Sequence, residues 1–98
     1  MYFVSRQKYL DGTPVVEIAT GGIESSNPDM LVEKYEGEGK EYRDPRRAVE
    51  VAINICRAWR HDGEKKAKIA IGDTLGATMP FEPVSFTEAK KWAQKEGG

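Results

Sequence analysis

The stretch D-P-R-R-A-V-E-V-A-I-N-I-C-R-A-W-R-H-D-G, from Asp44 to Gly63, predicts the longest helix of the chain. Asp44 is a preferred N-cap residue, and Pro45 suits the first helical position because an N–H there would have no partner. Gly63 suits the left-handed conformation that commonly ends a helix. The sequence therefore predicts a helix over residues 45–61, about 25 Å long. Apolar side chains recur at spacings of three and four residues and define its buried face: Ala48, Val49, Ala52, Ile53, Ile55, Cys56 and Trp59.

Two β-rich runs precede this helix. Residues 2–10 and 15–20 flank the turn signal Asp11-Gly12, a pattern that predicts an antiparallel hairpin. Arg6 and Lys8 have the same parity as Val4 and Leu10, so we expect a bulge or a partly solvated face there.

The remaining segments give shorter elements. Residues 27–37 favour a short helix or an irregular piece, with a strand as the open alternative, and residues 40–43 suit a brief extended piece. Apolar and basic residues alternate over 66–71, which predicts a half-buried strand. Residues 72–84 are predicted to be a long loop. A capping box, Ser-x-x-Glu, opens a final helix over 85–96.

These elements predict an α+β fold. A small sheet, made of the N-terminal hairpin and a later strand, is covered by one long and one short C-terminal helix. The 98 residues suit one compact domain spanning 1–98. Cys56 is the only cysteine, which excludes a disulfide scaffold. Because no apolar run has the length of a signal peptide's core or a membrane span, we expect a cytoplasmic protein that does not contact a membrane.

Charge is unevenly distributed along a chain whose net charge is only −1. Residues 43–72 carry eight basic and four acidic side chains. This basic segment starts with Arg43, Arg46 and Arg47 at the beginning of the long helix, where cations oppose the helix dipole. Together with unpaired helix N–H groups, the three arginines are candidates for binding an anion such as phosphate. The more ordinary interpretation is that they pair with nearby carboxylates, for example Glu50.

A broader basic surface would suit nucleic acid. Its further members would be Arg57, Arg60, Lys65, Lys66 and Lys68. However, the sequence has no nucleic-acid-binding motif, and Arg57 and Arg60 lie about 60° apart around the helix. A solvated face is therefore the favoured interpretation, and binding of nucleic acid is the alternative.

Two glycine-containing loops are a further candidate site. One loop contains Gly21 and Gly22, and the other contains Gly72, Asp73, Thr74 and Gly76. If both loops leave the same edge of the sheet, they form a small-molecule cleft with N–H and hydroxyl donors. Neither loop matches a nucleotide-binding motif, and ordinary turn chemistry is the favoured interpretation of the glycines.

Nothing in the sequence requires catalysis. His61 is the only histidine, and we expect neither a metal nor a cofactor. Cys56 and His61 lie about 140° apart around the helix, which is a poor geometry for a nucleophile and its base. The sequence favours a non-catalytic binding or accessory domain that contacts a protein partner or an anionic ligand. The alternatives are a nucleic-acid-associated protein and a small-ligand enzyme or sensor. Association with a second copy through the edge of the N-terminal hairpin is a further expectation.

Overall fold

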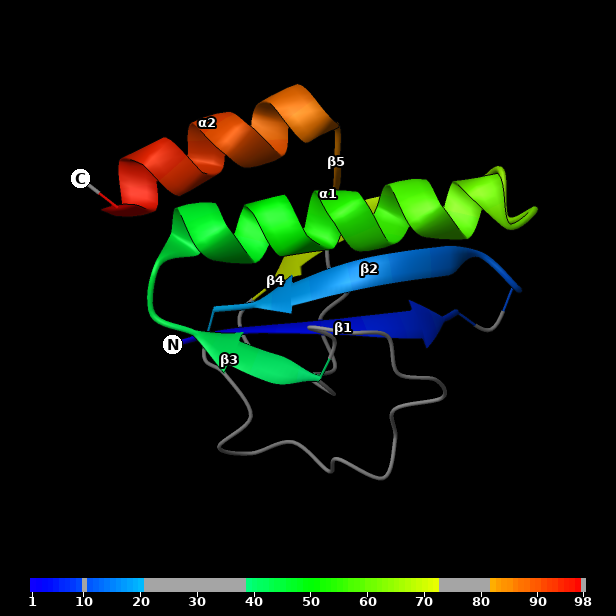
Figure 1. The fold of residues 1–98 in the computed structure, drawn as a ribbon, viewed down its shortest axis with the longest axis horizontal. Helices are drawn as coiled ribbons and strands as arrows, with labels where there is room; N and C mark the ends of the chain where they lie inside the picture. Colours follow the sequence, from blue (N-terminus) through cyan, green and yellow to red (C-terminus); the bar gives the residue numbers. More distant parts are fainter. Residues whose placement is uncertain (10, 21–38, 73–81, 98) are drawn as a thin grey trace.

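Five strands form one mixed sheet, and two helices cover one of its faces (Figure 1). The computed structural model describes residues 1–9, 11–20, 39–72 and 82–97. The predicted α+β fold is confirmed. The elements, in chain order, are β1 (Tyr2–Lys8), β2 (Pro14–Ala19), β3 (Lys40–Tyr42), α1 (Pro45–His61), β4 (Lys68–Gly72), β5 (Glu82–Val84) and α2 (Phe86–Gly97). Residues 27–37 lie outside the described residues.

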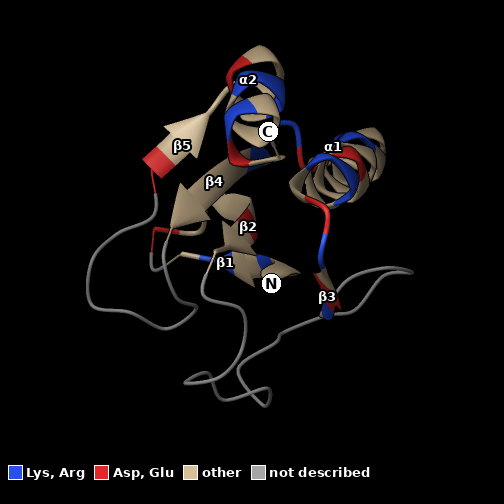
Figure 2. Cartoon of the chain, turned by 90° about the vertical axis from the view of Figure 1, so that its left-hand side faces the viewer, with Lys and Arg blue, Asp and Glu red and all other residues tan. Residues whose placement is uncertain are grey.

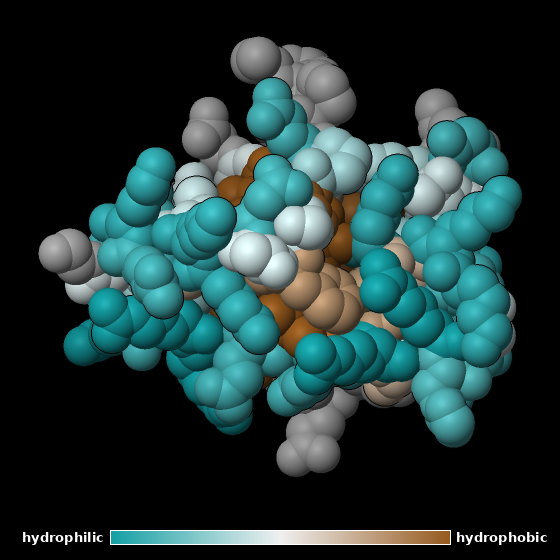
Figure 3. Space-filling model, turned by 90° about the horizontal axis from the view of Figure 1, so that it is seen from above, coloured by the Kyte–Doolittle hydropathy of each residue, from teal (hydrophilic) through white to brown (hydrophobic). Residues whose placement is uncertain are grey.

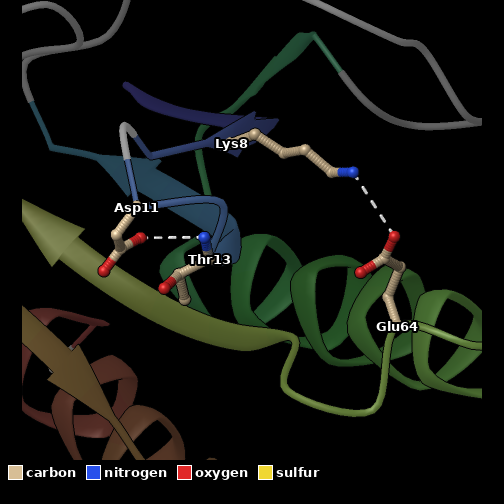
Figure 4. A network of polar contacts seen from close by, with 4 residues as sticks. All are labelled: Lys8, Asp11, Thr13 and Glu64. Carbon is tan, nitrogen blue, oxygen red and sulfur yellow. Dashed lines mark hydrogen bonds and ion pairs between the residues drawn. The ribbon is translucent and has the colours of Figure 1, made fainter.

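The predicted hairpin is formed by β1 and β2. The two strands pair antiparallel in an unbroken register from Phe3 opposite Ala19 to Lys8 opposite Pro14. Gly12 adopts a φ of 86°, a left-handed conformation that a side chain rarely permits. The carboxylate of Asp11 accepts a hydrogen bond from the Thr13 N–H at 2.8 Å, which closes the turn (Figure 4).

The basic residues of β1 do not mark a bulge, because the register is continuous. Arg6 lies on the helix-facing side and is only 5 % exposed. Its guanidinium carbon is 4.9 Å from the centre of the Trp59 ring, so a cation–π contact links β1 to α1. Lys8 is exposed, and its Nζ lies 3.4 Å from the Glu64 carboxylate (Figure 4).

Helix α1 has the predicted bounds and lies across the middle of the sheet. The Asp44 side chain accepts a hydrogen bond from the Arg46 N–H, and Gly63, with a φ of 117°, follows the helix end. After α1 the chain returns as β4, which pairs parallel to β2. The main core lies between the sheet and the helices, and its strand residues include Val16, Ile18 and Ile69.

The C-terminal part contains a strand where a loop was predicted. β5 pairs antiparallel with β4, with Val84 opposite Ile69 and Glu82 opposite Ile71. Pro83 is tolerated because β5 is an edge strand.

The predicted capping box is present at the start of α2. The Ser85 N–H donates to the Glu88 carboxylate at 3.2 Å, and the Glu88 N–H donates to the Ser85 hydroxyl at 3.1 Å.

The order of strands is β3-β1-β2-β4-β5. β3 pairs with β1 from Tyr2, opposite Tyr42, to Val4, opposite Lys40, so this part of β1 is not an edge of the sheet. Association with a second copy through this hairpin is not tested by the structure and stays a prediction. The two edge strands, β3 and β5, are three residues long each.

No helix in the described ranges has the length and apolar character needed to cross a membrane.

Candidate ligand-binding groove

A groove of about 330 Å³ lies between α1 and α2. The helices run antiparallel, because Gly97 at the end of α2 lies against Pro45 at the start of α1, and Phe86 lies against Arg57. Figure 3 looks down on this face and shows hydrophobic residues in the centre, surrounded by hydrophilic ones. The groove is lined by Arg46, Val49, Glu50, Ile53, Asn54, Arg57, Lys90, Ala93 and Gln94.

The helical repeat explains why the groove has an apolar floor and a polar rim. Val49 and Ile53 are one turn apart on α1, and Ala93 faces them from α2. All three side chains are at most 4 % exposed, so they form the floor. The six polar residues lie beside this buried stripe and are all exposed.

The rim carries more positive than negative charge. Arg46, Arg57 and Lys90 are its cations, and Glu50 is its carboxylate. The Glu50 carboxylate accepts a hydrogen bond from Arg47 Nη1 at 2.6 Å, which compensates its charge from outside the groove. Among the described residues, none of the three rim cations forms an ion pair with a carboxylate. Figure 2 shows the basic segments on both helices. An anionic group in the groove would therefore meet uncompensated cations.

The three arginines predicted to bind an anion separate in the structure. Arg46 lines the groove, whereas Arg47 pairs with Glu50 and Arg43 is exposed before the helix. The ordinary interpretation, pairing with a nearby carboxylate such as Glu50, therefore holds for Arg47. The Asp44 carboxylate already accepts the Arg46 N–H at 3.0 Å, so part of the helix N-terminus is satisfied within the chain.

The residues of the broader basic surface do not gather on one face. Arg60 donates from Nε to the Ala67 carbonyl at 2.8 Å, and its guanidinium carbon is 4.8 Å from the centre of the Phe86 ring. Lys65 and Lys66 are exposed after α1. Lys68 alternates with the helix-facing Ile69, so it lies on the opposite face of the sheet.

The strands before the two glycine loops end side by side. Ala19 pairs with Gly72, and the Thr20 N–H donates to the Gly72 carbonyl at 2.8 Å. The carboxyl ends of β2 and β4 therefore meet at one edge of the sheet, as a shared cleft requires. Gly72 is half-buried. Gly21, Gly22, Asp73, Thr74 and Gly76 lie outside the described residues, so the cleft stays a prediction.

A polar cluster on the second face of the sheet was missed from the sequence. Glu17 is 7 % exposed in the central strand β2, and it accepts a hydrogen bond from the Tyr9 hydroxyl at 2.9 Å. Burial raises the pKa of the Glu17 carboxyl, and the Tyr9 hydrogen bond partly opposes this rise. Ser5 lies opposite Glu17 and accepts a hydrogen bond from the Gln7 amide at 3.2 Å. These groups satisfy one another, so the cluster is a structural feature of the sheet.

The residues with nucleophilic or metal-binding chemistry are separate. Cys56 is fully buried, and burial raises the pKa of its thiol, which disfavours the reactive thiolate. His61 is exposed in the last turn of α1. Within residues 1–9, 11–20, 39–72 and 82–97, no three His, Cys, Asp or Glu side chains come together as a metal site would require.

Comparisons of this chain with protein families, curated proteins and solved structures find no match. Fold alone does not define a function, so the function has to be inferred from the chemistry of the groove.

Proposed function

We propose that this chain is a non-catalytic binding module that holds an anionic, partly apolar ligand in the groove between α1 and α2. The observation that supports the proposal is the combination of an apolar floor with three rim cations and a single carboxylate that Arg47 compensates. A binding groove of this kind needs apolar surface for affinity and a few placed charges for selectivity. The net charge of the chain is −1, so attraction of an anion has to come from this local arrangement.

The first test uses 8-anilinonaphthalene-1-sulfonate, an apolar aromatic anion whose fluorescence rises in an apolar site. Arg46→Gln and Lys90→Gln are each expected to weaken its binding by about three- to tenfold, since each removes one charge from the rim. Affinity is also expected to fall as salt rises, because the rim cations are exposed.

Matched controls exist just before α1, at Arg43, and on α2, at Lys91. Arg43→Gln and Lys91→Gln make the same change of charge at exposed positions outside the groove, and both are expected to leave the affinity within about twofold of the parent chain. Equal weakening by the groove variants and the control variants would reject the proposal, because it would show a response to net charge alone.

The nucleic-acid alternative is tested by fluorescence anisotropy with single- and double-stranded oligonucleotides. Lys68 and the basic residues of α1 lie on opposite faces of the sheet, so they do not form one continuous basic surface. We therefore expect that the chain does not show the salt-sensitive oligonucleotide binding typical of phosphate contacts. Micromolar binding that is lost steeply with rising salt would favour the nucleic-acid alternative instead.

A further inference from the structure

We propose that the occupant of the groove is an acidic amphipathic helix of a partner protein, which packs beside α1 and α2 as a third helix. This inference rests on the proposed function and specifies the class of ligand.

The positions of the cations favour a ligand with several anionic groups. Arg46 and Arg57 are eleven residues apart on α1, which corresponds to about 16 Å along the helix axis. Lys90 lies on the opposite wall. A ligand with one carboxylate or phosphate engages one end of this groove. A ligand with acidic groups spread over a similar length engages both ends at once.

The floor favours a helical ligand over an extended one. Val49 and Ile53 are spaced one turn apart, so they accommodate apolar side chains that recur every three or four residues. An extended peptide would place unpaired backbone N–H and C=O groups against this apolar floor. The groove walls are helices, so they offer no strand edge with which those groups could pair. A helix satisfies its own backbone groups and can lie on the floor without that cost.

The small side chain on the facing wall permits close approach. Ala93 is 2 % exposed at the bottom of the groove, and an alanine leaves room for a larger apolar side chain of the partner above it. The groove volume of about 330 Å³ suits one row of such side chains. Because a groove of this size holds a short ligand segment, we expect micromolar affinity.

The experiment measures fluorescence anisotropy of three labelled, helix-stabilised peptides of roughly 15 residues with the full chain. In the first peptide, two glutamates eleven residues apart flank two leucines, and all four side chains share one helix face because eleven residues return to within about 20° of the start. The second peptide has the same composition, with both glutamates at one end. The third has lysine in place of each glutamate.

We expect the first peptide to bind at least about fivefold more tightly than the second, and the third not to bind. Arg46→Gln should remove the advantage of the first peptide over the second, whereas Arg43→Gln should preserve it. Arg57→Lys should retain binding and Arg57→Gln should weaken it. Because Arg57 also stacks on Phe86, the unfolding transition of both Arg57 variants is measured, and Lys90→Gln provides an independent test of the rim.

The outcomes separate this inference from the proposed function. One outcome is that Arg46→Gln weakens binding of both acidic peptides and of the sulfonate probe equally. The groove then binds anions but does not select an amphipathic helix, and only the inference is overturned. If neither the probe nor any peptide responds to Arg46→Gln, both proposals are overturned. Displacement of the first peptide by an oligonucleotide at equal charge concentration would also overturn the inference, because it would show a preference for charge over an amphipathic helix.

Discussion

Glu17 is a carboxylic acid buried in the central strand of the sheet, with the Tyr9 hydroxyl as its hydrogen-bond donor. Burial raises its pKa in the folded chain above the ordinary value of 4.5. The folded state therefore holds the Glu17 proton more tightly than the unfolded state does. The resulting stabilisation is fully present below pH 4.5 and is lost as the pH rises through the folded-state pKa.

Glu17→Gln is expected to remove this pH dependence. The amide keeps an acceptor for Tyr9 but cannot ionise, so the variant should be more stable than the parent chain at about pH 8 and the difference should shrink toward about pH 4. Urea unfolding of both chains across this pH range measures the difference in stability. Tyr9→Phe should do the opposite and steepen the loss of stability, because the Tyr9 hydrogen bond lowers the Glu17 pKa. If the difference in the free energy of unfolding between Glu17→Gln and the parent chain does not change with pH, the raised pKa of Glu17 is contradicted.

Arg6 and Trp59 form the second unusual contact at the residue scale. The Arg6 guanidinium is nearly buried against the Trp59 ring, where a desolvated cation–π contact is worth about 1–2 kcal/mol. A double-mutant cycle with Arg6→Met and Trp59→Leu should therefore give a coupling free energy of about 1 kcal/mol. Lys8→Met serves as the control, since Lys8 is exposed and its Nζ lies beside the Glu64 carboxylate. Additive losses of stability in the first cycle would show that the two side chains contribute independently.

The local sequence does not indicate the contacts of Arg6 and Glu17, and the reason is physical. Arg6 breaks the alternation of β1, and a solvated face or a bulge explains such a break when the chain is viewed in isolation. Its actual partner, Trp59, is 53 residues away and reaches it only after α1 docks on the sheet. Glu17 likewise has its partner eight residues away across the hairpin turn, and nothing local indicates that Tyr9 faces it.

At the scale of elements, local signals predicted both helices well. The Asp44-Pro45 start and the Ser85–Glu88 capping box act within one turn, and both are present in the structure. β5 was missed because a three-residue segment containing Pro83 has no strand pattern, and its pairing with β4 depends on the tertiary fold. The groove also depends on the tertiary fold. Arg46 was predicted as a binding residue, but Lys90 joins it only because α2 docks antiparallel to α1.

The capping box allows a test of how much α2 depends on its first turn. Ser85→Ala removes the hydroxyl that accepts the Glu88 N–H and should lower the free energy of unfolding by about 1 kcal/mol. Thr87→Ala, an exposed change in the same turn, should have a smaller effect. Thermal unfolding followed by circular dichroism measures both variants. Equal losses for the two would indicate that the cap makes no specific contribution.

At the scale of the whole molecule, strand order determines which parts of the sheet are exposed to other chains. β2 is buried along its whole length and pairs with β1 on one side and β4 on the other. β3 and β5 form the edges, and each is three residues long. Short edges and a proline are common protections against strand pairing between molecules. The edges that β3 and β5 form are therefore short for pairing with a second copy, whereas the proposed partner site lies on the helical face.

Amide hydrogen exchange tests this organisation directly. The slowest exchange is expected in β2, whose amides open only when the whole sheet unfolds, and the fastest strand exchange is expected in β3 and β5. The pattern should not change with protein concentration if the edges remain unpaired. Protection of β5 equal to that of β2, rising with concentration, would show that a second copy adds to this edge despite Pro83. Protection that rises instead on α1 and α2 when the acidic peptide is added would place the contact on the helices, where the three rim cations lie.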